Sequence, residues 1–461
     1  MTVGLGRTHT PSWQGVADAL RGKLYLPGDA DYDERRRVWN GAIDRRPLAI
    51  ARCIDPEDVA AAVKFAAHER VPMTVRGGGH NVAGLAVRDD ALMLDLGAMN
   101  RVEIDAQARV ARVEGGALWR DVDTATQPHG LATTGGFVST TGVGGYTLGG
   151  GVGWLMRRCG LAIDNLLEAE VVLADGRSVT ASDKQHPDLF WGLRGGGGGL
   201  GVATRFTFRL HPVGEVHAGV VFYRLDAARE LLRAFRAFTQ DAADALTAML
   251  VFTTAPPLPF LPAEAHGQRT VALAYCWNGD LAQGARAAAP LTEAAEPLGR
   301  HEDEMPYAAW QQTFDPAAAP GHQYYWTTSQ FDAFDDALID ALVPRAAEPA
   351  DPLCEVHVHH LGGAVARIAN DATAFSHRDA PFFINVIGHT DAAERFAGIR
   401  DWARGLRDAL APHARADMQP NFVGEVADLD AHAPGSATRT KLSALRARYD
   451  PEGLLAPVRS G

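Results

Sequence analysis

The side chains best suited to proton transfer lie late in the chain, in the run Glu355-Val-His357-Val-His359-His360. Side chains alternate between the two faces of a strand, so Glu355, His357 and His359 are expected on one face. A histidine titrates near neutral pH and could act as a base, and Glu355 is a second candidate if its site raises its pKa. The same residues could instead bind a metal ion, or line a pocket without taking part in chemistry.

Four glycine-rich patches form a second signal. They are Arg76-Gly-Gly-Gly-His80-Asn81, Gly135-Gly136, Gly142 to Gly153 and Gly195 to Gly201. Successive glycines let backbone N–H groups turn toward one anion, and they admit a bulky cofactor against the main chain. The chain has no complete GxGxxG between a strand and a helix, and no Gly-Lys-Ser/Thr of a P-loop. Flexible linkers are a weaker interpretation, because strong strand patterns flank the patches.

The elements that must position these motifs can be read from the apolar pattern. A helix is expected over Pro56–His68, then a strand over Met73–Val75 that runs into Gly77. Asp175-Gly176 predicts the turn of a hairpin between strands at 171–174 and 178–181. The segment from Gly135 to Gly153 contains too much glycine for a regular element to be expected.

After about Val213 the dense glycine patches stop. Strands are expected at 220–223, 246–253, 271–277 and 356–360, with a helix at 227–238. This mixture predicts an α+β domain with an antiparallel sheet. A division follows into residues 1–212, a substrate-binding region at 213–412, and a C-terminal segment at 413–461 that returns to the first domain.

Composition narrows the function classes. The 461 residues carry 44 basic and 56 acidic side chains, a net charge of −12, which gives no electrostatic support for a nucleic-acid partner. The four cysteines are too few and too dispersed for a disulfide scaffold. Residues 1–14 hold no apolar run and no stretch is apolar enough to span a membrane. A cytoplasmic monomer or homodimer without membrane contact is expected.

The chain resembles the FAD-linked oxidases of the berberine-bridge-enzyme type, which have the vanillyl-alcohol-oxidase fold with a PCMH-type FAD-binding domain. The resemblance rests on the first and third glycine patches, Gly160-Leu-Ala-Ile-Asp-Asn165, Asp188-Leu-Phe-Trp-Gly-Leu-Arg-Gly-Gly-Gly197 and the closing Tyr449-Asp-Pro-Glu-Gly-Leu-Leu455. The entry segments Asp31–Glu34 and Val38-Trp-Asn-Gly41 fit as well. It is nearest in appearance to bacterial members acting on polyketides and other secondary metabolites, of the type found in enterocin biosynthesis.

The resemblance implies an extended FAD, with a two-subdomain FAD-binding domain over residues 1–212. The residues that it implies around FAD are Val75, Arg76, Gly77, Gly78, Gly79, His80, Asn81, Gly84, Gly135, Val138, Thr141, Gly142, Gly144, Gly145, Gly149, Gly151, Gly153, Trp154, Asp164, Asn165, Val202 and Asn421.

The resemblance also implies that FAD is covalently bound through His80 at its 8α-methyl. Relatives with a second bond use a cysteine at a position that looks like Val138 here, so a single bond is expected. Cys159, well downstream, is interpreted as a small packed residue. Thr141 matches the position that controls oxygen access in relatives, although it could simply hydrogen-bond backbone in a turn.

Relatives carry a catalytic tyrosine in a Tyr-x-Asn-Phe motif, which reads Gln419-Pro-Asn421-Phe422 here. Glutamine cannot act as a base, so the substitute is sought at Glu355, His357 and His359, with Thr141 and Asn421 as further catalytic candidates. Tyr324, Tyr325 and Trp326 could stack on a planar substrate.

These residues predict an oxidase that uses O2 on a small-molecule natural product. A flavin-dependent oxygenase, a sugar or alcohol oxidase, and a flavin-containing protein that binds a drug for resistance are the alternatives.

Overall fold

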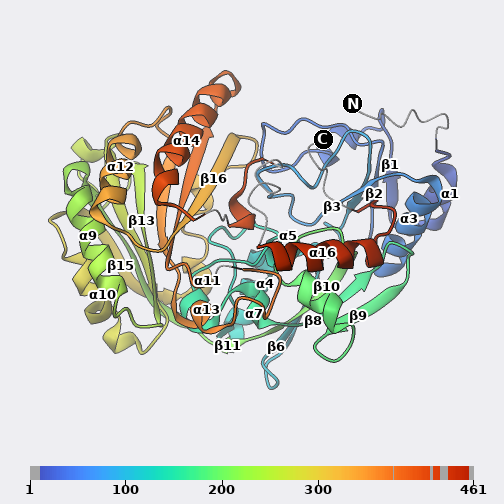
Figure 1. Cartoon of the computed structure of the whole chain (residues 1–461), viewed down its shortest axis with the longest axis horizontal. Coiled ribbons are helices and arrows are strands. Elements are labelled where there is room, and N and C mark those ends of the chain that lie inside the picture. Colours follow the sequence, from blue (N-terminus) through green and yellow to red (C-terminus); the bar gives the residue numbers. More distant parts are fainter. Residues whose placement is uncertain (1–10, 377, 416–418, 426–434, 456–461) are drawn as a thin grey trace.

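The computed structural model describes residues 11–376, 378–415, 419–425 and 435–455. Two halves lie side by side in Figure 1. The half on the right carries two sheets from the first part of the chain, and the half on the left is built on one large sheet. None of the described helices is long and apolar enough to cross a membrane.

The first sheet has the strand order β1-β2-β4-β3. Its strands are β1 (Lys23–Tyr25), β2 (Ala49–Arg52), β3 (Met73–Arg76) and β4 (Leu92–Asp95); β2 and β3 both lie parallel to β4. Helix α3 (Pro56–Glu69) connects β2 to β3, which confirms the predicted helix. The Asp55 carboxylate accepts the Asp58 N–H at its start, and an alanine- and valine-lined face is buried. Strand β3 ends directly before Gly77, so it fixes where the His80 loop begins.

The second sheet has the order β5-β6-β10-β8-β9, with every neighbouring pair antiparallel. Its strands are β5 (Val102–Asp105), β6 (Val110–Glu114), β8 (Leu166–Val172), β9 (Ser178–Ser182) and β10 (Val202–Arg209). The β8–β9 pair confirms the hairpin predicted from Asp175-Gly176. Helix α8 (Pro187–Leu193) and the C-terminal helix α16 (Ser436–Tyr449) pack onto this sheet in one apolar cluster.

The expectation that 135–153 holds no regular element is wrong in part. Helix α5 (Val143–Leu148) lies inside that segment. A Cβ at Gly144 would lie 3.0 Å from the Gly115 carbonyl oxygen, so glycine lets the helix approach the backbone there. Burial of Val143 and Tyr146 in the core stabilises the helix against the poor helix propensity of its glycines.

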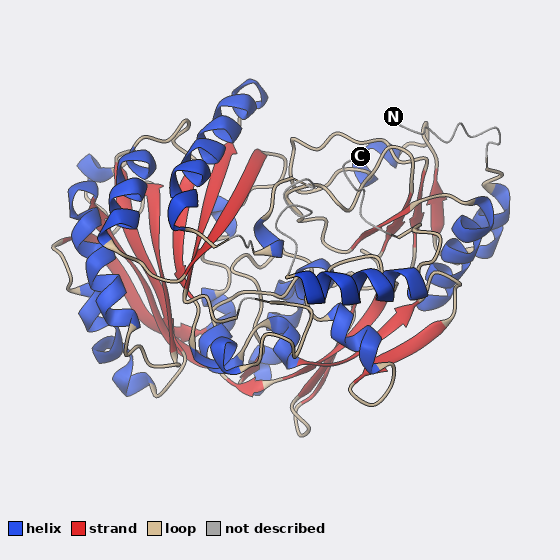
Figure 2. Cartoon of the chain, in the orientation of Figure 1, coloured by secondary structure: helices blue, strands red, loops and turns tan. Residues whose placement is uncertain are grey.

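The large sheet has seven strands in the order β15-β12-β14-β13-β17-β18-β16, all antiparallel. They are β12 (Glu215–Arg224), β13 (Leu246–Thr254), β14 (Arg269–Trp277), β15 (Pro297–Pro306), β16 (Gln323–Phe331), β17 (Glu355–His360) and β18 (Phe382–Thr390). Helices α9 (Ala228–Thr239), α10 (Gly284–Thr292), α12 (Asp336–Ala347) and α14 (Phe396–Leu410) cover one face (Figure 2). The other face points to the first half of the molecule. The predicted α+β class with an antiparallel substrate sheet is thereby confirmed.

Short elements connect the halves. Strand β7 (Leu131–Ala132) pairs with β11 (His211–Pro212). The remaining helices are α1 (Gln14–Ala19), α2 (Tyr32–Arg35), α4 (Trp119–Thr126), α6 (Met156–Cys159), α7 (Ala162–Asn165), α11 (Tyr307–Trp310) and α13 (Gly363–Arg367).

Candidate active site

A cavity of about 890 Å³ is lined by both halves of the molecule. The glycine patches supply one wall, and strands β13, β16, β17 and β18 supply another. This volume lies at the upper end of the range for small-molecule and cofactor pockets. The cavity therefore brings the loop that carries His80 together with the strand that carries His357.

Most of the residues expected around a flavin do line this cavity. They are Val75, Gly77, Gly78, Gly79, His80, Asn81, Gly84, Val138, Thr141, Gly142, Gly144, Gly145, Gly149, Val202 and Asn421. The catalytic candidates Glu355, His357 and His359 line it too. Around Gly145 and Gly197 an added Cβ would meet no atom within 4 Å, so these glycines border open space. The wall suits a bulky cofactor, as FAD requires.

Other glycines are needed for contacts within the protein. A Cβ at Gly78 would lie 2.5 Å from the Gly142 nitrogen, and one at Gly153 would lie 1.7 Å from the Gly135 oxygen. Backbone cannot move aside as a flexible side chain can. Glycines in three of the four patches are therefore needed for the packing of one loop on another. Gly135, Gly151 and Gly153 lie outside the cavity lining.

Four further residues that were expected to contact the flavin lie outside the lining of this cavity. Arg76 pairs with buried Asp95 at 2.7 Å and does not line the cavity. Trp154 is fully buried against Trp310 and other aromatic rings. Asn165 holds His211 by a 2.6 Å hydrogen bond.

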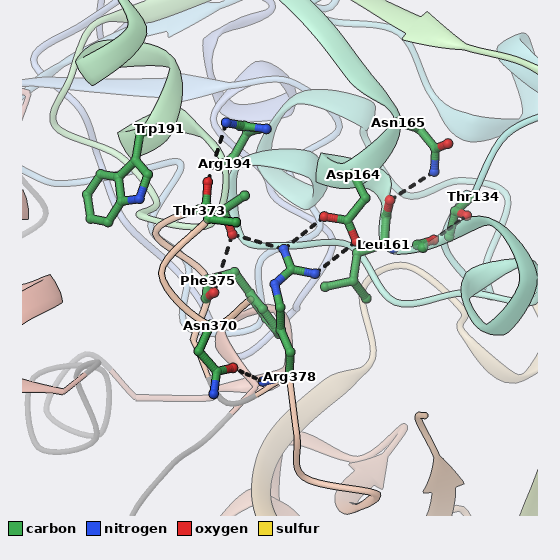
Figure 3. Close-up of polar contacts among 12 residues, drawn as sticks. Thr134, Leu161, Asp164, Asn165, Trp191, Arg194, Asn370, Thr373, Phe375 and Arg378 are labelled. Carbon is green, nitrogen blue, oxygen red and sulfur yellow. Dashed lines mark hydrogen bonds and ion pairs between the residues drawn. The ribbon is translucent and has the colours of Figure 1, made fainter. Parts of the chain in front are cut away.

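Asp164, the fourth, forms a two-pronged ion pair with buried Arg378, as Figure 3 shows. Local sequence could not reveal these roles, because each partner comes from a distant segment.

His80 is half-buried in the lining of the cavity. Burial lowers the pKa of its imidazole from 6.5 to about 4, so the ring is neutral at physiological pH. Its Nε2 lies 3.4 Å from the Thr140 hydroxyl, and its ring stacks on Trp39 at 4.2 Å between centroids. A neutral imidazole retains a nitrogen lone pair that can attack carbon.

None of the four cysteines, all in the described part of the chain, lines the cavity. Cys159 packs against an apolar cluster, and burial raises the pKa of its thiol to about 11. Val138 does line the cavity but has no nucleophile. Thr141 lines it as well, and its backbone N–H donates to the Val138 carbonyl at 3.2 Å in a turn.

Glu355 and His357 form a pair on strand β17. His357 Nε2 lies 2.9 Å from Glu355 Oε2, and the Thr253 hydroxyl donates to Glu355 Oε1 at 2.7 Å. Burial alone would raise the pKa of Glu355. The hydrogen bond and charge of His357, the hydrogen bond from Thr253 and the charge of Arg269 together outweigh burial, so the pKa is lowered. Glu355 is therefore a carboxylate, which can only accept, and His357 carries its proton on Nε2.

Among the described residues, four buried polar atoms on the cavity wall have no hydrogen-bond partner: Thr74 Oγ1, Trp326 Nε1, His359 Nε2 and Asn385 Oδ1. His359 is stacked on Phe383 at 4.2 Å, and burial lowers its pKa well below 6.5, so the ring is neutral. Unpaired buried polar atoms are costly, and a bound ligand is the usual way to satisfy them at a cavity wall.

Asn421 and Gln419 have different surroundings. Asn421 donates to the Tyr146 carbonyl at 2.9 Å and accepts the Gly151 N–H at 3.0 Å, which fixes the wall of the cavity. Gln419 is fully buried, does not line the cavity, and has no partner for its side-chain amide. The position expected to hold the base of relatives therefore offers no proton acceptor to this cavity.

Several wall residues were missed by sequence reasoning. Asn385, Ile387 and His389 face the cavity from β18, and Phe314 and Met249 contribute apolar surface. The available signal was the pair Asn385 and His389, which are four positions apart in the largely apolar run of β18 and therefore lie on one face of the strand. Of the predicted aromatic group, Tyr324 and Trp326 line the cavity, whereas Tyr325 points to the helix-covered face and packs in its core.

Within the described residues, no group of three or more His, Cys, Asp or Glu side chains is placed to hold a metal ion. In that part of the chain, His357 and His359 therefore do not belong to such a group.

Comparisons with known proteins agree with this geometry. A family model described as an FAD binding domain matches residues 47–182. The chain is 28% identical over 406 residues to the uncharacterized FAD-linked oxidoreductase YgaK of Bacillus subtilis, covering 86% of this chain and 87% of that protein.

Among solved structures, 6-hydroxy-D-nicotine oxidase from Arthrobacter nicotinovorans superposes with a TM-score of 0.84 at 26% identity, covering 94% and 96% of the two chains. The BBE-like 1 protein of Physcomitrella patens shares the fold, with a TM-score of 0.85, 21% identity, and 96% and 97% coverage.

Fold and site together define an FAD-linked oxidoreductase with a PCMH-type FAD-binding domain and a separate substrate sheet. The resemblance to the berberine-bridge-enzyme type is confirmed by these relatives.

Proposed function

We propose that this protein is an oxidase that holds FAD through a single covalent bond to His80 and oxidises a small-molecule natural product with O2. The observation that carries the proposal is the Glu355–His357 pair, which faces the same cavity as the glycine loop of His80. A base and an anchoring loop in one cavity are what an oxidase of this class needs.

The residues that would hold FAD are the cavity-lining glycines at 77–79 and those at the start of helix α5 (142–145), with Asn81 and Thr141 beside them. Their backbone N–H groups suit the pyrophosphate, and open space beside Gly145 leaves room for it. When bound, FAD supplies the hydride acceptor and the site at which O2 is reduced.

Proton transfer is assigned to His357. The Glu355 carboxylate fixes the Nε2–H tautomer of its ring, so Nδ1 is free to accept a proton from a substrate hydroxyl or amine. Orientation falls to the aromatic walls formed by Trp326, Phe314 and Phe422, which suit a planar substrate. The unpaired atoms of Asn385 and His359 would take polar groups of the cofactor or substrate.

Support for a single covalent bond comes from the environment of the cysteines. His80 is neutral and borders the cavity, whereas no cysteine does. Acid-precipitated protein should stay yellow, and H80A should release its flavin into the supernatant.

The experiment combines anaerobic flavin reduction with product analysis. A panel of hydroxylated and amine-bearing aromatics, beginning with 6-hydroxynicotine, is screened for bleaching of the flavin and for hydrogen peroxide in air. H357A should slow bleaching roughly tenfold or more, as expected for loss of a proton-transfer group. H301A is the matched control, because His301 is exposed on edge strand β15 and does not line the cavity.

An unchanged bleaching rate in H357A would remove His357 from the mechanism. Incorporation of labelled oxygen into product, in place of stoichiometric peroxide, would show an oxygenase. Tight binding without bleaching by any compound would point to a binding protein.

A further inference from the structure

The segment Trp39-Asn40 joins the His80 loop to the substrate sheet. Trp39 N–H donates to the Gly79 carbonyl at 3.0 Å, and the Trp39 carbonyl accepts the Gly321 N–H at 2.9 Å. Asn40 donates from one amide nitrogen to the carbonyls of Val82, at 2.8 Å, and Tyr324, at 2.9 Å. The segment thus contacts the loop on both sides of His80 and the first strand residues of β16.

The indole of Trp39 lies between two rings. Its centroid is 4.2 Å from that of His80 with the planes 16° apart, and 3.9 Å from that of Tyr324 with the planes 20° apart. Tyr324 stacks in turn on His389 at 4.3 Å. Trp39 Nε1 donates to the Ala318 carbonyl at 2.9 Å, which fixes the indole plane. Four nearly parallel rings therefore run from the anchoring histidine into the substrate sheet.

The stacked rings restrict the rotation of the His80 imidazole about its side-chain bonds. On one face it meets Trp39, and at its edge Nε2 meets the Thr140 hydroxyl at 3.4 Å. Trp39 is only 6% exposed, so its indole cannot move away from His80 without disturbing the surrounding packing. A ring held this way keeps one orientation at the wall of the cavity.

We propose that Trp39 is a positioning residue for flavin attachment: its indole holds the His80 imidazole in the orientation from which the nitrogen joins the 8α-carbon of FAD. In that step the N–C bond forms, and the imidazole N–H and one 8α-methyl hydrogen pass to the flavin ring with two electrons. O2 then removes these as hydrogen peroxide. The inference rests on the proposed function, because it requires His80 to be the anchor.

The test compares ringless and ring-bearing variants at position 39. W39L and W39M fill the space without a planar ring, whereas W39F keeps a ring and, like them, lacks the indole N–H. Each purified protein is incubated with excess FAD, precipitated with acid at intervals, and the flavin in pellet and supernatant is measured. Unfolding midpoints and total flavin content report whether the variants are folded and loaded.

Attachment should be roughly tenfold slower in W39L and W39M, a size expected from losing two stacked-ring contacts, with FAD still bound non-covalently. W39F should restore most of the rate. W13L is the matched control: Trp13 packs on Phe65, 5.3 Å away, and does not line the cavity, so attachment should be unchanged.

The outcomes separate the two proposals. Wild-type protein whose flavin is entirely acid-soluble would refute the covalent anchor itself, and the inference with it. Wild-type protein with covalent flavin, together with ringless variants that attach it at the same rate, would refute the role of Trp39 alone. Equal slowing in W39F and W39L would also overturn it, because the ring would then not matter.

Discussion

The ion pair between Arg378 and Asp164 offers a direct test of the packing between the halves. Arg378 lies in the segment between β17 and β18, and Asp164 lies in α7 of the first half. The two nitrogens of the guanidinium lie 2.9 and 2.8 Å from the two carboxylate oxygens, and Thr373 accepts a further bond at 2.9 Å. Figure 3 shows this fork-like arrangement. The perturbation is R378A.

The expected loss of unfolding free energy in R378A follows from the burial of both side chains. Only 1% of the Arg378 side chain and 4% of the Asp164 side chain are exposed. Removing Arg378 leaves a buried carboxylate whose remaining bonds include that from the Leu161 N–H. Loss of one partner of a buried pair costs about 3–5 kcal/mol of unfolding free energy. The exposed pair Arg177–Asp175, with side chains 73% and 51% exposed, is the matched control, and R177A should cost less than about 1 kcal/mol.

The assay is urea unfolding of flavin-loaded protein at pH 7, followed by tryptophan fluorescence. The flavin content of folded R378A should equal that of wild type, because neither residue lines the cavity. The double variant D164A/R378A should lose less than the sum of the single variants, by about 0.5–3 kcal/mol. If R378A is no less stable than R177A, the assignment of Asp164 to structure is refuted. Loss of flavin from folded R378A would instead indicate that Asp164 contributes to binding the cofactor.

Two further outcomes are expected. G78A should lower the flavin content of the purified protein, because its Cβ would lie 2.5 Å from the Gly142 nitrogen and push the His80 loop away. G15A is the control and should not lower it, because a Cβ at Gly15 would meet no atom within 4 Å. Equal flavin content in the two variants would contradict the close-packing argument. Burial lowers the pKa of His360 to about 3 and of His389 to about 4, while unfolded histidines bind protons below about pH 6.5. Stability should therefore fall from pH 6.5 toward pH 4 by about 1.4 kcal/mol per pH unit for each histidine, and a urea midpoint that does not change between pH 7 and 5 would refute this.

Local sequence patterns were enough to predict the parts of the fold that depend on residues close together in the chain. The buried face of α3, the hairpin at Asp175-Gly176 and the shared face of Glu355, His357 and His359 all follow from spacing within a few positions. Capping, turn chemistry and strand alternation act over such short distances, so one sequence is enough to reveal them.

Helix α5 was not predicted, because it depends on contacts with distant residues and not on its local sequence. Its glycines oppose helix formation locally, and only contact with the Gly115 backbone and the surrounding core makes the helix favourable.

The sequence by itself predicted the class of cofactor and the candidate anchor His80, through the family resemblance that its short motifs carry. Tertiary structure decided which of those residues face the cavity. Asp164 and Trp154 are drawn into buried contacts with segments far along the chain, while Asn385 and His389 are brought to the cavity by strand pairing. Tertiary structure also decided the protonation of both groups: burial keeps His80 neutral, and hydrogen bonds with nearby charges keep Glu355 ionised despite its burial.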